Sequence, residues 1–203
     1  MFDNIKTLKL VFTGEKGAGT NTIVSEFIES LNESFEPNYK ENYGSLVIKV
    51  DGKKVKLSIF CGSLNKDFET CDHIFENSSA VVLVYSKTIK KSLEEIKNYW
   101  FEKVKNSSPK SAVIAIVENK EILYQEKEDS DITKSDGYKF ANQKNALFYK
   151  VSVKYKKSLN DMFMGITKKI LEIKKQTDEL NNKKDNGAEK VEGKGCCTSC
   201  QII

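Results

Sequence analysis

A glycine-rich segment, Gly14–Asn21, has residue types and a spacing suited to holding phosphate groups. Gly14 and Gly19 are separated by four residues, as in the phosphate-binding loop that joins a strand to a helix. Glycines let backbone N–H groups approach phosphate oxygens closely, and the helix terminus adds partial positive charge. Two positions depart from the pattern, because Thr20 stands at the lysine position and Asn21 at the magnesium-binding Ser/Thr position. A strand-to-helix turn that binds nothing is the alternative interpretation.

A second chemical signal lies near the carboxyl end, where residues 200–203 are Cys-Gln-Ile-Ile. This order fits the C-a-a-X pattern, so we expect prenylation of Cys200, and the final Ile favours a geranylgeranyl group. One such lipid binds membranes only marginally, so a second signal is needed. Cys196 and Cys197 are candidates for palmitoylation, with free thiols as the alternative. The charges of Lys183–Lys194 are too balanced for a basic patch.

Composition narrows the classes of function. The 203 residues carry a net charge of +4 from 33 basic and 29 acidic residues, too weak and too mixed to indicate nucleic-acid binding. The chain contains no Arg, so it has no arginine to place in its own active site. The longest apolar run, Ala80–Tyr85, is too short to span a bilayer, and we expect membrane contact through lipidation instead. The five Cys favour a reducing, cytosolic setting over a disulfide framework.

Strand and helix patterns alternate along the chain and would position the loop. Six strands are predicted at residues 8–12, 43–50, 54–60, 80–85, 112–117 and 146–151, with a tight hairpin turn at Asp51-Gly52. Helices are predicted at 21–31, 93–104, 137–142 and 159–173. This order predicts an α/β fold of the phosphate-loop NTPase type: a six-stranded, mostly parallel sheet with one antiparallel edge hairpin and helices on both faces. The predicted globular domain is 1–178, and 179–203 is a flexible tail.

The chain resembles the Ras superfamily of small GTPases, and its Ras and Rab branches in particular, over about residues 6–175 and the tail. The most specific matches are the glycine-rich loop, the hairpin at 50–60, Asn119-Lys120 and Ser152-Val153-Lys154. The resemblance implies GTP or GDP bound with Mg²⁺, slow GTP hydrolysis, and two switch loops that sense the γ-phosphate. The residues expected to contact nucleotide are Gly14, Lys16, Gly17, Ala18, Gly19, Thr20, Asn21, Asn119, Lys120, Ser152, Val153 and Lys154.

The switch segments match the family only in part. In the first switch the family has a Thr that binds magnesium, whereas this chain has Asn38, so Asn21 and Asn38 are the expected magnesium ligands. In the second switch, Cys61 replaces the Asp that supports magnesium. Asn65 replaces the Gln that orients the attacking water and is the expected catalytic residue, with a side chain one methylene shorter. Lys16 either crowds the γ-phosphate, which we favour, or partly replaces the missing lysine charge.

The guanine-binding box is half present. Asn119-Lys120 fits the family pattern, but Ile122 stands where the family has an Asp that accepts two hydrogen bonds from guanine. The loss of two charged hydrogen bonds costs about 3–6 kcal/mol, or two to four decades of affinity. Ser152-Val153-Lys154 resembles the Ser-Ala-Lys box of the family, in which a backbone N–H reaches the guanine oxygen.

These departures predict a prenyl-anchored Ras/Rab-like protein, a switch or scaffold in vesicle traffic or signalling, with weakened GTP binding and little hydrolysis. A conventional GTP-hydrolysing switch is the alternative, and whether the chain is an enzyme stays open. We discount another phosphate-loop enzyme, such as a nucleotide kinase, because no second catalytic constellation is present in the sequence. The expected partners are effectors or regulators at the switch regions, a prenyltransferase, and a membrane reached through the lipid tail. The expected location is the cytoplasmic face of a membrane, with a cytosolic pool.

Overall fold

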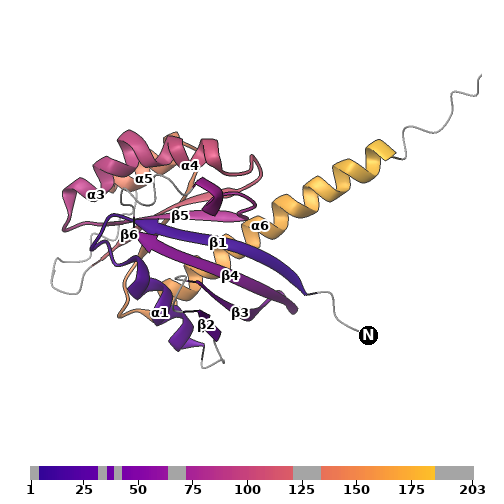
Figure 1. The fold of residues 1–203 in the computed structure, drawn as a ribbon, viewed down its shortest axis with the longest axis horizontal. Coiled ribbons are helices and arrows are strands. Elements are labelled where there is room, and N and C mark those ends of the chain that lie inside the picture. The colour runs from indigo at the N-terminus through magenta and orange to yellow at the C-terminus, as the bar shows by residue number, and fades with distance from the viewer. Residues whose placement is uncertain (1–4, 32–35, 39–42, 64–71, 121–133, 186–203) are drawn as a thin grey trace, which may run out of the picture.

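The computed structural model describes residues 5–31, 36–38, 43–63, 72–120 and 134–185. These residues build one seven-stranded sheet in the order β2-β3-β4-β1-β5-β6-β7 (Figure 1). β1, β4, β5, β6 and β7 run parallel, whereas β3 is antiparallel to both of its neighbours. The strands are β1 (Lys6–Gly14), β2 (Glu36–Asn38), β3 (Tyr43–Val50), β4 (Lys53–Ser63), β5 (Ala80–Ser86), β6 (Val113–Asn119) and β7 (Leu147–Val151).

Helices cover both faces of the sheet (Figure 1). On one face, Phe27 of α1 and Phe163 of α6 stack with ring centroids 3.6 Å apart, and Phe163 also stacks on Phe12 of β1. β5 is buried along its whole length because both faces are covered. One face carries α1 (Thr20–Ser30) and α6 (Lys156–Asp185), and the other carries α3 (Lys90–Glu95), the π-helical turn η2 (Ile96–Trp100), α4 (Phe101–Ser107) and α5 (Asp136–Gln143), with the 3-10 turn η1 (Asp72–Ile74).

The predicted fold class, a mostly parallel sheet with an antiparallel edge and helices on both faces, is confirmed. The sheet has seven strands rather than the six predicted, because Glu36–Asn38 pairs with β3 as an additional edge strand. A strand of three residues is too short to display an alternating pattern, so the sequence alone did not predict it. The hairpin turn lies at Asp51-Gly52 as predicted, with φ angles of 48° and 80° and Val50 paired to Lys53.

The last helix is longer than its sequence pattern predicts. α6 continues past residue 178 to Asp185, so the predicted domain boundary lies within the helix. Its apolar stripe ends before this extension, where Leu180 is 61% exposed. Extending an existing helix requires no new nucleus, and Lys, Glu and Leu are good helix formers. None of the helices in the described part of the chain is long and apolar enough to cross a membrane.

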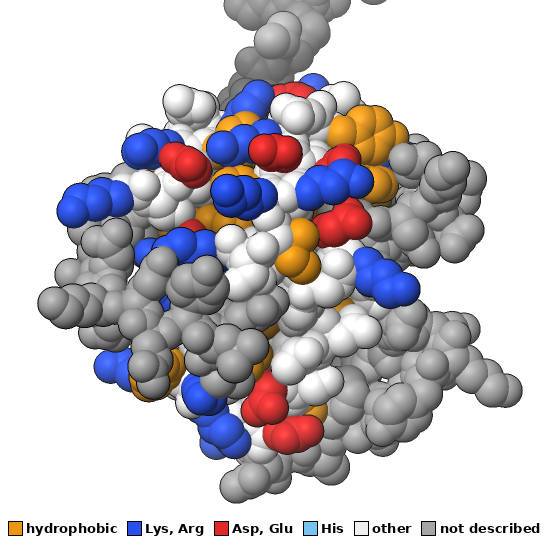
Figure 2. All heavy atoms as spheres, turned by 90° about the vertical axis from the view of Figure 1, so that its left-hand side faces the viewer, with side chains coloured by type: hydrophobic (Ala, Val, Ile, Leu, Met, Phe, Trp, Pro, Cys, Tyr) orange, Lys and Arg blue, Asp and Glu red, His pale blue; other side chains and the backbone are white. Residues whose placement is uncertain are grey.

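The parallel strands bring the predicted site residues to one edge of the sheet. β1 ends at Gly14, β6 at Asn119 and β7 at Val151, and parallel strands present their carboxyl ends at the same edge. This carboxyl edge lies on the left in Figure 1 and faces the viewer in Figure 2. Lysine and acidic side chains are interspersed on this face rather than gathered into one patch (Figure 2). A ligand at this edge would therefore be recognised by individual side chains and backbone groups rather than by a patch of one charge.

Candidate functional site

The glycine-rich loop has the backbone geometry that phosphate binding needs. Gly17 and Gly19 adopt φ angles of 90° and 85°, which L side chains rarely tolerate. A Cβ atom at Gly14 would collide with the Val84 carbonyl oxygen of the neighbouring strand. The loop turns through a hydrogen bond from the Ala18 N–H to the Glu15 carbonyl, at 2.9 Å, and α1 follows directly. The conformation of a phosphate cradle at a helix N-terminus is therefore present.

Asn119 joins this loop to the end of β6. Its Nδ2 atom donates to the Ala18 carbonyl at 2.9 Å, and its side chain is buried. A Cβ atom at Gly19 would collide with that same amide group. Asn119 Oδ1 is buried and has no hydrogen-bond partner among the described residues. The loop and the first guanine-box residue therefore form one connected unit.

The side chain that replaces the loop lysine does not take over its role. Thr20 is 6% exposed, and its hydroxyl has no hydrogen-bond partner in the described part of the chain. A threonine side chain is too short and carries no charge with which to reach outer phosphates. Lys16, the other basic residue of the loop, is exposed. The loop thus offers backbone N–H groups and no buried cation.

The residues at the two magnesium-supporting positions contact one another. Cys61 Sγ, at the end of β4, donates to Asn21 Oδ1 at 3.0 Å. Burial raises the pKa of the Cys61 thiol to about 12, so the sulfur stays neutral at physiological pH. Mg²⁺ prefers charged or strongly polar oxygen ligands in octahedral geometry. A neutral thiol paired to an amide oxygen does not fit this ion.

The second guanine-box segment lies beside the first. The Lys120 N–H donates to the Val151 carbonyl at 2.8 Å, which ties the residue after β6 to the end of β7. Ser152 is buried, and its backbone N–H donates a hydrogen bond to Ser158 Oγ at 3.2 Å. Val153 and Lys154 follow in the turn that leads into α6. The structure thus brings the loop, Asn119-Lys120 and the segment 152–154 to the same edge.

Several predicted site residues lie outside the described residues. They are Asn65, Ile122 and the tail residues Cys196, Cys197 and Cys200. Asn38 belongs to β2, whose backbone pairs with Tyr43, and its side chain is not described.

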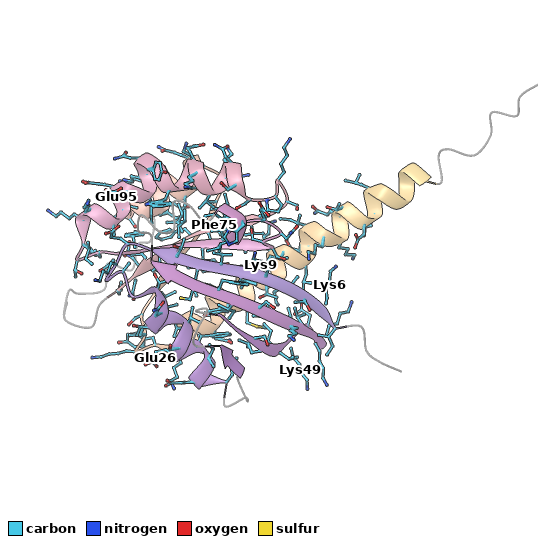
Figure 3. All side chains as sticks on the ribbon, viewed as in Figure 1. Lys6, Lys9, Glu26, Lys49, Phe75 and Glu95 are labelled. Carbon is cyan, nitrogen blue, oxygen red and sulfur yellow. The ribbon has the colours of Figure 1, made fainter. Side chains whose placement is uncertain are left out.

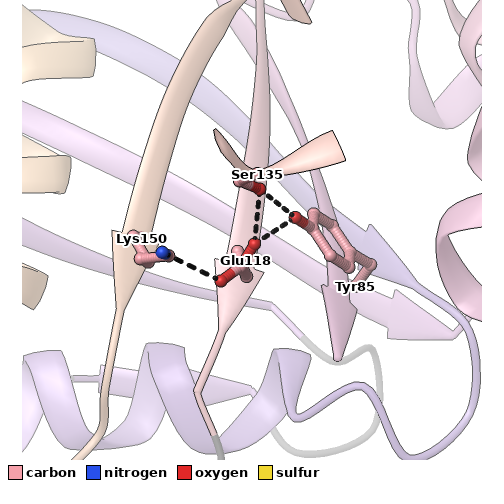
Figure 4. Close-up of polar contacts among 4 residues, drawn as sticks. All are labelled: Tyr85, Glu118, Ser135 and Lys150. Atoms are coloured by element: carbon pink, nitrogen blue, oxygen red, sulfur yellow. Dashed lines mark hydrogen bonds and ion pairs between the residues drawn. The ribbon is translucent and has the colours of Figure 1, made fainter. Parts of the chain in front are cut away.

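Sequence reasoning missed a buried polar cluster next to the guanine box (Figure 4). Glu118, 4% exposed, accepts hydrogen bonds from Tyr85 Oη and from Ser135 Oγ, the latter at 2.7 Å. Its other oxygen lies 3.6 Å from Lys150 Nζ. Burial and the Glu118 carboxylate raise the pKa of Tyr85, so the phenol remains a donor. The cluster joins β5, β6, β7 and the start of α5, and holds the end of β6 that carries Asn119. The one signal in the sequence was Glu118 itself, an acidic residue directly after the apolar run 112–117.

A mostly parallel α/β sheet with a glycine-rich loop between β1 and α1 is typical of the phosphate-loop proteins. The model of the Ras family matches residues 9–172, and the chain therefore belongs to the Ras family. Relatives include "Ras-related protein Rab-18" of Lymnaea stagnalis, 25% identical and covering 95% of each chain. "GTP-binding protein ypt5" of Schizosaccharomyces pombe is 27% identical over 82% of this chain and 80% of its own. "Ras-related protein RABC2b" of Arabidopsis thaliana is 23% identical, over 85% of this chain and 84% of its own.

Membership places the chain among the Ras/Rab-like small GTPases. The family in general binds GTP or GDP with Mg²⁺ and interacts with effectors and regulators. In this chain the loop has the backbone geometry of a phosphate cradle, whereas other residue types stand at the charged and magnesium-binding positions of the family.

Proposed function

We propose that this chain is a prenyl-anchored, Ras/Rab-like switch or scaffold with weakened guanine-nucleotide binding and little GTP hydrolysis. It acts at the cytoplasmic face of a membrane, with a cytosolic pool, in vesicle traffic or signalling. Effectors or regulators bind its switch regions. The globular domain covers residues 1–178, and the tail of 179–203 begins as the extension of α6. Bound nucleotide would contact the loop Gly14–Asn21, Asn119-Lys120 and the segment 152–154.

The Asn21–Cys61 contact is the observation that carries the proposal. In the family these two positions support the magnesium ion that bridges the phosphates, and here they satisfy each other at 3.0 Å. Hydrolysis requires both phosphate charge stabilisation and an oriented water. The chain has no Arg, Thr20 is uncharged, and the shorter Asn65 stands at the water-orienting position. The conventional GTP-hydrolysing switch is therefore not favoured.

GDP binding by the wild-type chain should depend little on magnesium. For the wild-type chain we expect the GDP dissociation constant to change less than about tenfold, or 1.4 kcal/mol, when Mg²⁺ is replaced by EDTA. The Asn21→Ser, Cys61→Asp double variant restores a hydroxyl and a carboxylate, so its GDP binding should weaken more strongly in EDTA. Titration of a fluorescent GDP analogue measures both constants. Asn21→Ser alone is the matched control, and strong magnesium dependence in the wild-type chain would count against the proposal.

The lipid anchor rests on the order Cys200-Gln201-Ile202-Ile203. A prenyltransferase would attach the isoprenoid to Cys200, because the aliphatic residues after it fit the C-a-a-X pattern. Palmitoylation of Cys196 and Cys197 would strengthen attachment, since one prenyl chain binds only marginally.

Cys200→Ser removes the thiol that would carry the prenyl group. We expect a larger cytosolic share of this variant than of the wild-type chain when cells are fractionated, because without the prenyl group the tail inserts no lipid that would bring Cys196 and Cys197 to the membrane for palmitoylation. The control is Cys71→Ser, which leaves the tail unchanged. Equal partitioning of Cys200→Ser and the wild-type chain would refute the anchor.

A further inference from the structure

A lysine-rich groove lies at the end of the sheet opposite the glycine-rich loop. It has a volume of about 880 Å³ and is formed by the β3–β4 hairpin, the start of β1 and the outer half of α6. Lys6 and Lys49 mark this end in Figure 3, on the side where α6 leaves the sheet. The basic residues that line the groove are Lys6, Lys49, Lys53, Lys54, Lys168 and Lys175.

Acidic residues do not balance this groove. Its three lining acids are Asp51, Glu172 and Asp178. Asp51 is paired to Lys168 at 2.9 Å, and Glu172 accepts from Lys169, a residue that does not line the groove, at 3.3 Å. All six lining lysines are exposed. The groove therefore has an excess of positive charge that can attract an anionic partner.

Positive charge is also crowded around Lys174, which neighbours the groove on α6. Its pKa is lowered by partial burial and, secondly, by the positive charge of Lys6. Repulsion between these ammonium groups would be relieved by an anion bound between α6 and the start of β1.

The position of the groove relates it to the tail. α6 passes along the groove between Lys168 and Asp178 and then ends at Asp185, fifteen residues before Cys200 in the sequence. β1 separates Lys6 from Gly14 by eight residue steps, or about 26 Å at 3.3 Å per residue. A surface bound at the groove would thus leave the carboxyl edge, with its loop, directed away (Figure 1).

We infer that this lysine groove docks on the anionic lipid headgroups of a membrane surface. The inference rests on the proposed membrane role, to which it adds an electrostatic attachment besides the lipids of the tail. Residues 183–194 contain four Lys against three acidic residues, so the tail itself is a poor basic anchor. Ile5, 38% exposed at the groove, adds an apolar side chain at the interface. Surface lysines attract anionic lipids only within about a Debye length, so the groove must face the membrane closely.

Vesicle binding by the full-length, unprenylated chain tests this inference separately from the anchor. We expect co-sedimentation with phosphatidylcholine vesicles that contain phosphatidylserine, and none with phosphatidylcholine alone. The variant Lys49→Gln, Lys53→Gln, Lys54→Gln should bind the anionic vesicles roughly 100-fold more weakly, since each lysine near the surface contributes ~1 kcal/mol. Raised salt should weaken wild-type binding in the same direction.

The matched control removes the same charge from the opposite end of the molecule. Lys91→Gln, Lys156→Gln, Lys157→Gln alters three exposed lysines near the carboxyl edge and should bind like the wild-type chain. Equal losses in both triple variants would show a general charge effect and overturn the inference. The inference would also be overturned if the wild-type chain bound vesicles equally well with and without phosphatidylserine, or if it bound neither. Because the tested chain carries no lipid, failure of Cys200→Ser to relocate in cells would leave this result unchanged. Thermal unfolding checks that all three chains are folded.

Discussion

Replacing Thr20 with Lys and Ile122 with Asp in one chain should raise its affinity for GDP and GTP about 100- to 10,000-fold. Asp at position 122 would accept two hydrogen bonds from guanine, which Ile cannot do. Lys at position 20 would return a positive charge to a loop whose backbone already has the required shape, with Gly17 and Gly19 in the left-handed region. The gain is large because the cradle does not have to be rebuilt. Isothermal titration calorimetry measures the affinities of the two chains side by side.

A neutral pair of similar size is the matched control. Thr20→Gln with Ile122→Asn supplies polar groups without charge, so it should recover only a small part of the affinity. The charged pair should favour guanine over adenine nucleotides, because the two accepted hydrogen bonds are particular to guanine. If the charged pair brings no gain over the neutral pair, the assignment of Thr20 and Ile122 to these two positions is wrong.

Much of the fold could be predicted from the sequence because it rests on local patterns. The buried run Ala80–Tyr85 predicted a central strand, and it is β5, covered on both faces. Asp51-Gly52 predicted a hairpin whose turn the structure confirms. Two features could not be predicted from local patterns. The three residues of β2 are too few to show periodicity, and α6 extends to Asp185, beyond its apolar stripe.

The site was less predictable because its contacts join residues that are distant in the sequence. Asn21 and Cys61 each depart from the family pattern, and nothing local in the sequence predicts their contact. It arises because β1 pairs in parallel with β4, so the start of α1 lies beside the end of β4. The cluster of Tyr85, Glu118 and Ser135 depends in the same way on three separate elements. The lysine groove combines a hairpin with the outer half of α6, and no single segment is basic enough to indicate it.

This chain has the shape of a Ras-family nucleotide site without the charges that the family pattern places in it. The shape of the nucleotide site depends on glycine conformations, the Asn119–Ala18 hydrogen bond and the parallel sheet, all of which this chain has. The chemistry of the site depends on charges at positions 20, 61 and 122, where this chain has Thr, Cys and Ile. We expect such a domain to present its surfaces to partners with little dependence on the nucleotide cycle.

The nucleotide content of the purified protein tests this account most directly. A tightly bound nucleotide stays with a protein through purification, whereas the substitutions at positions 20 and 122 should let it dissociate. We predict that the chain, purified with Mg²⁺, denatured and run on ion-exchange chromatography, releases clearly less than one equivalent of GDP. The Thr20→Lys, Ile122→Asp chain, treated identically, should release more. A full equivalent of GDP from the wild-type chain would contradict the central claim of weakened nucleotide binding.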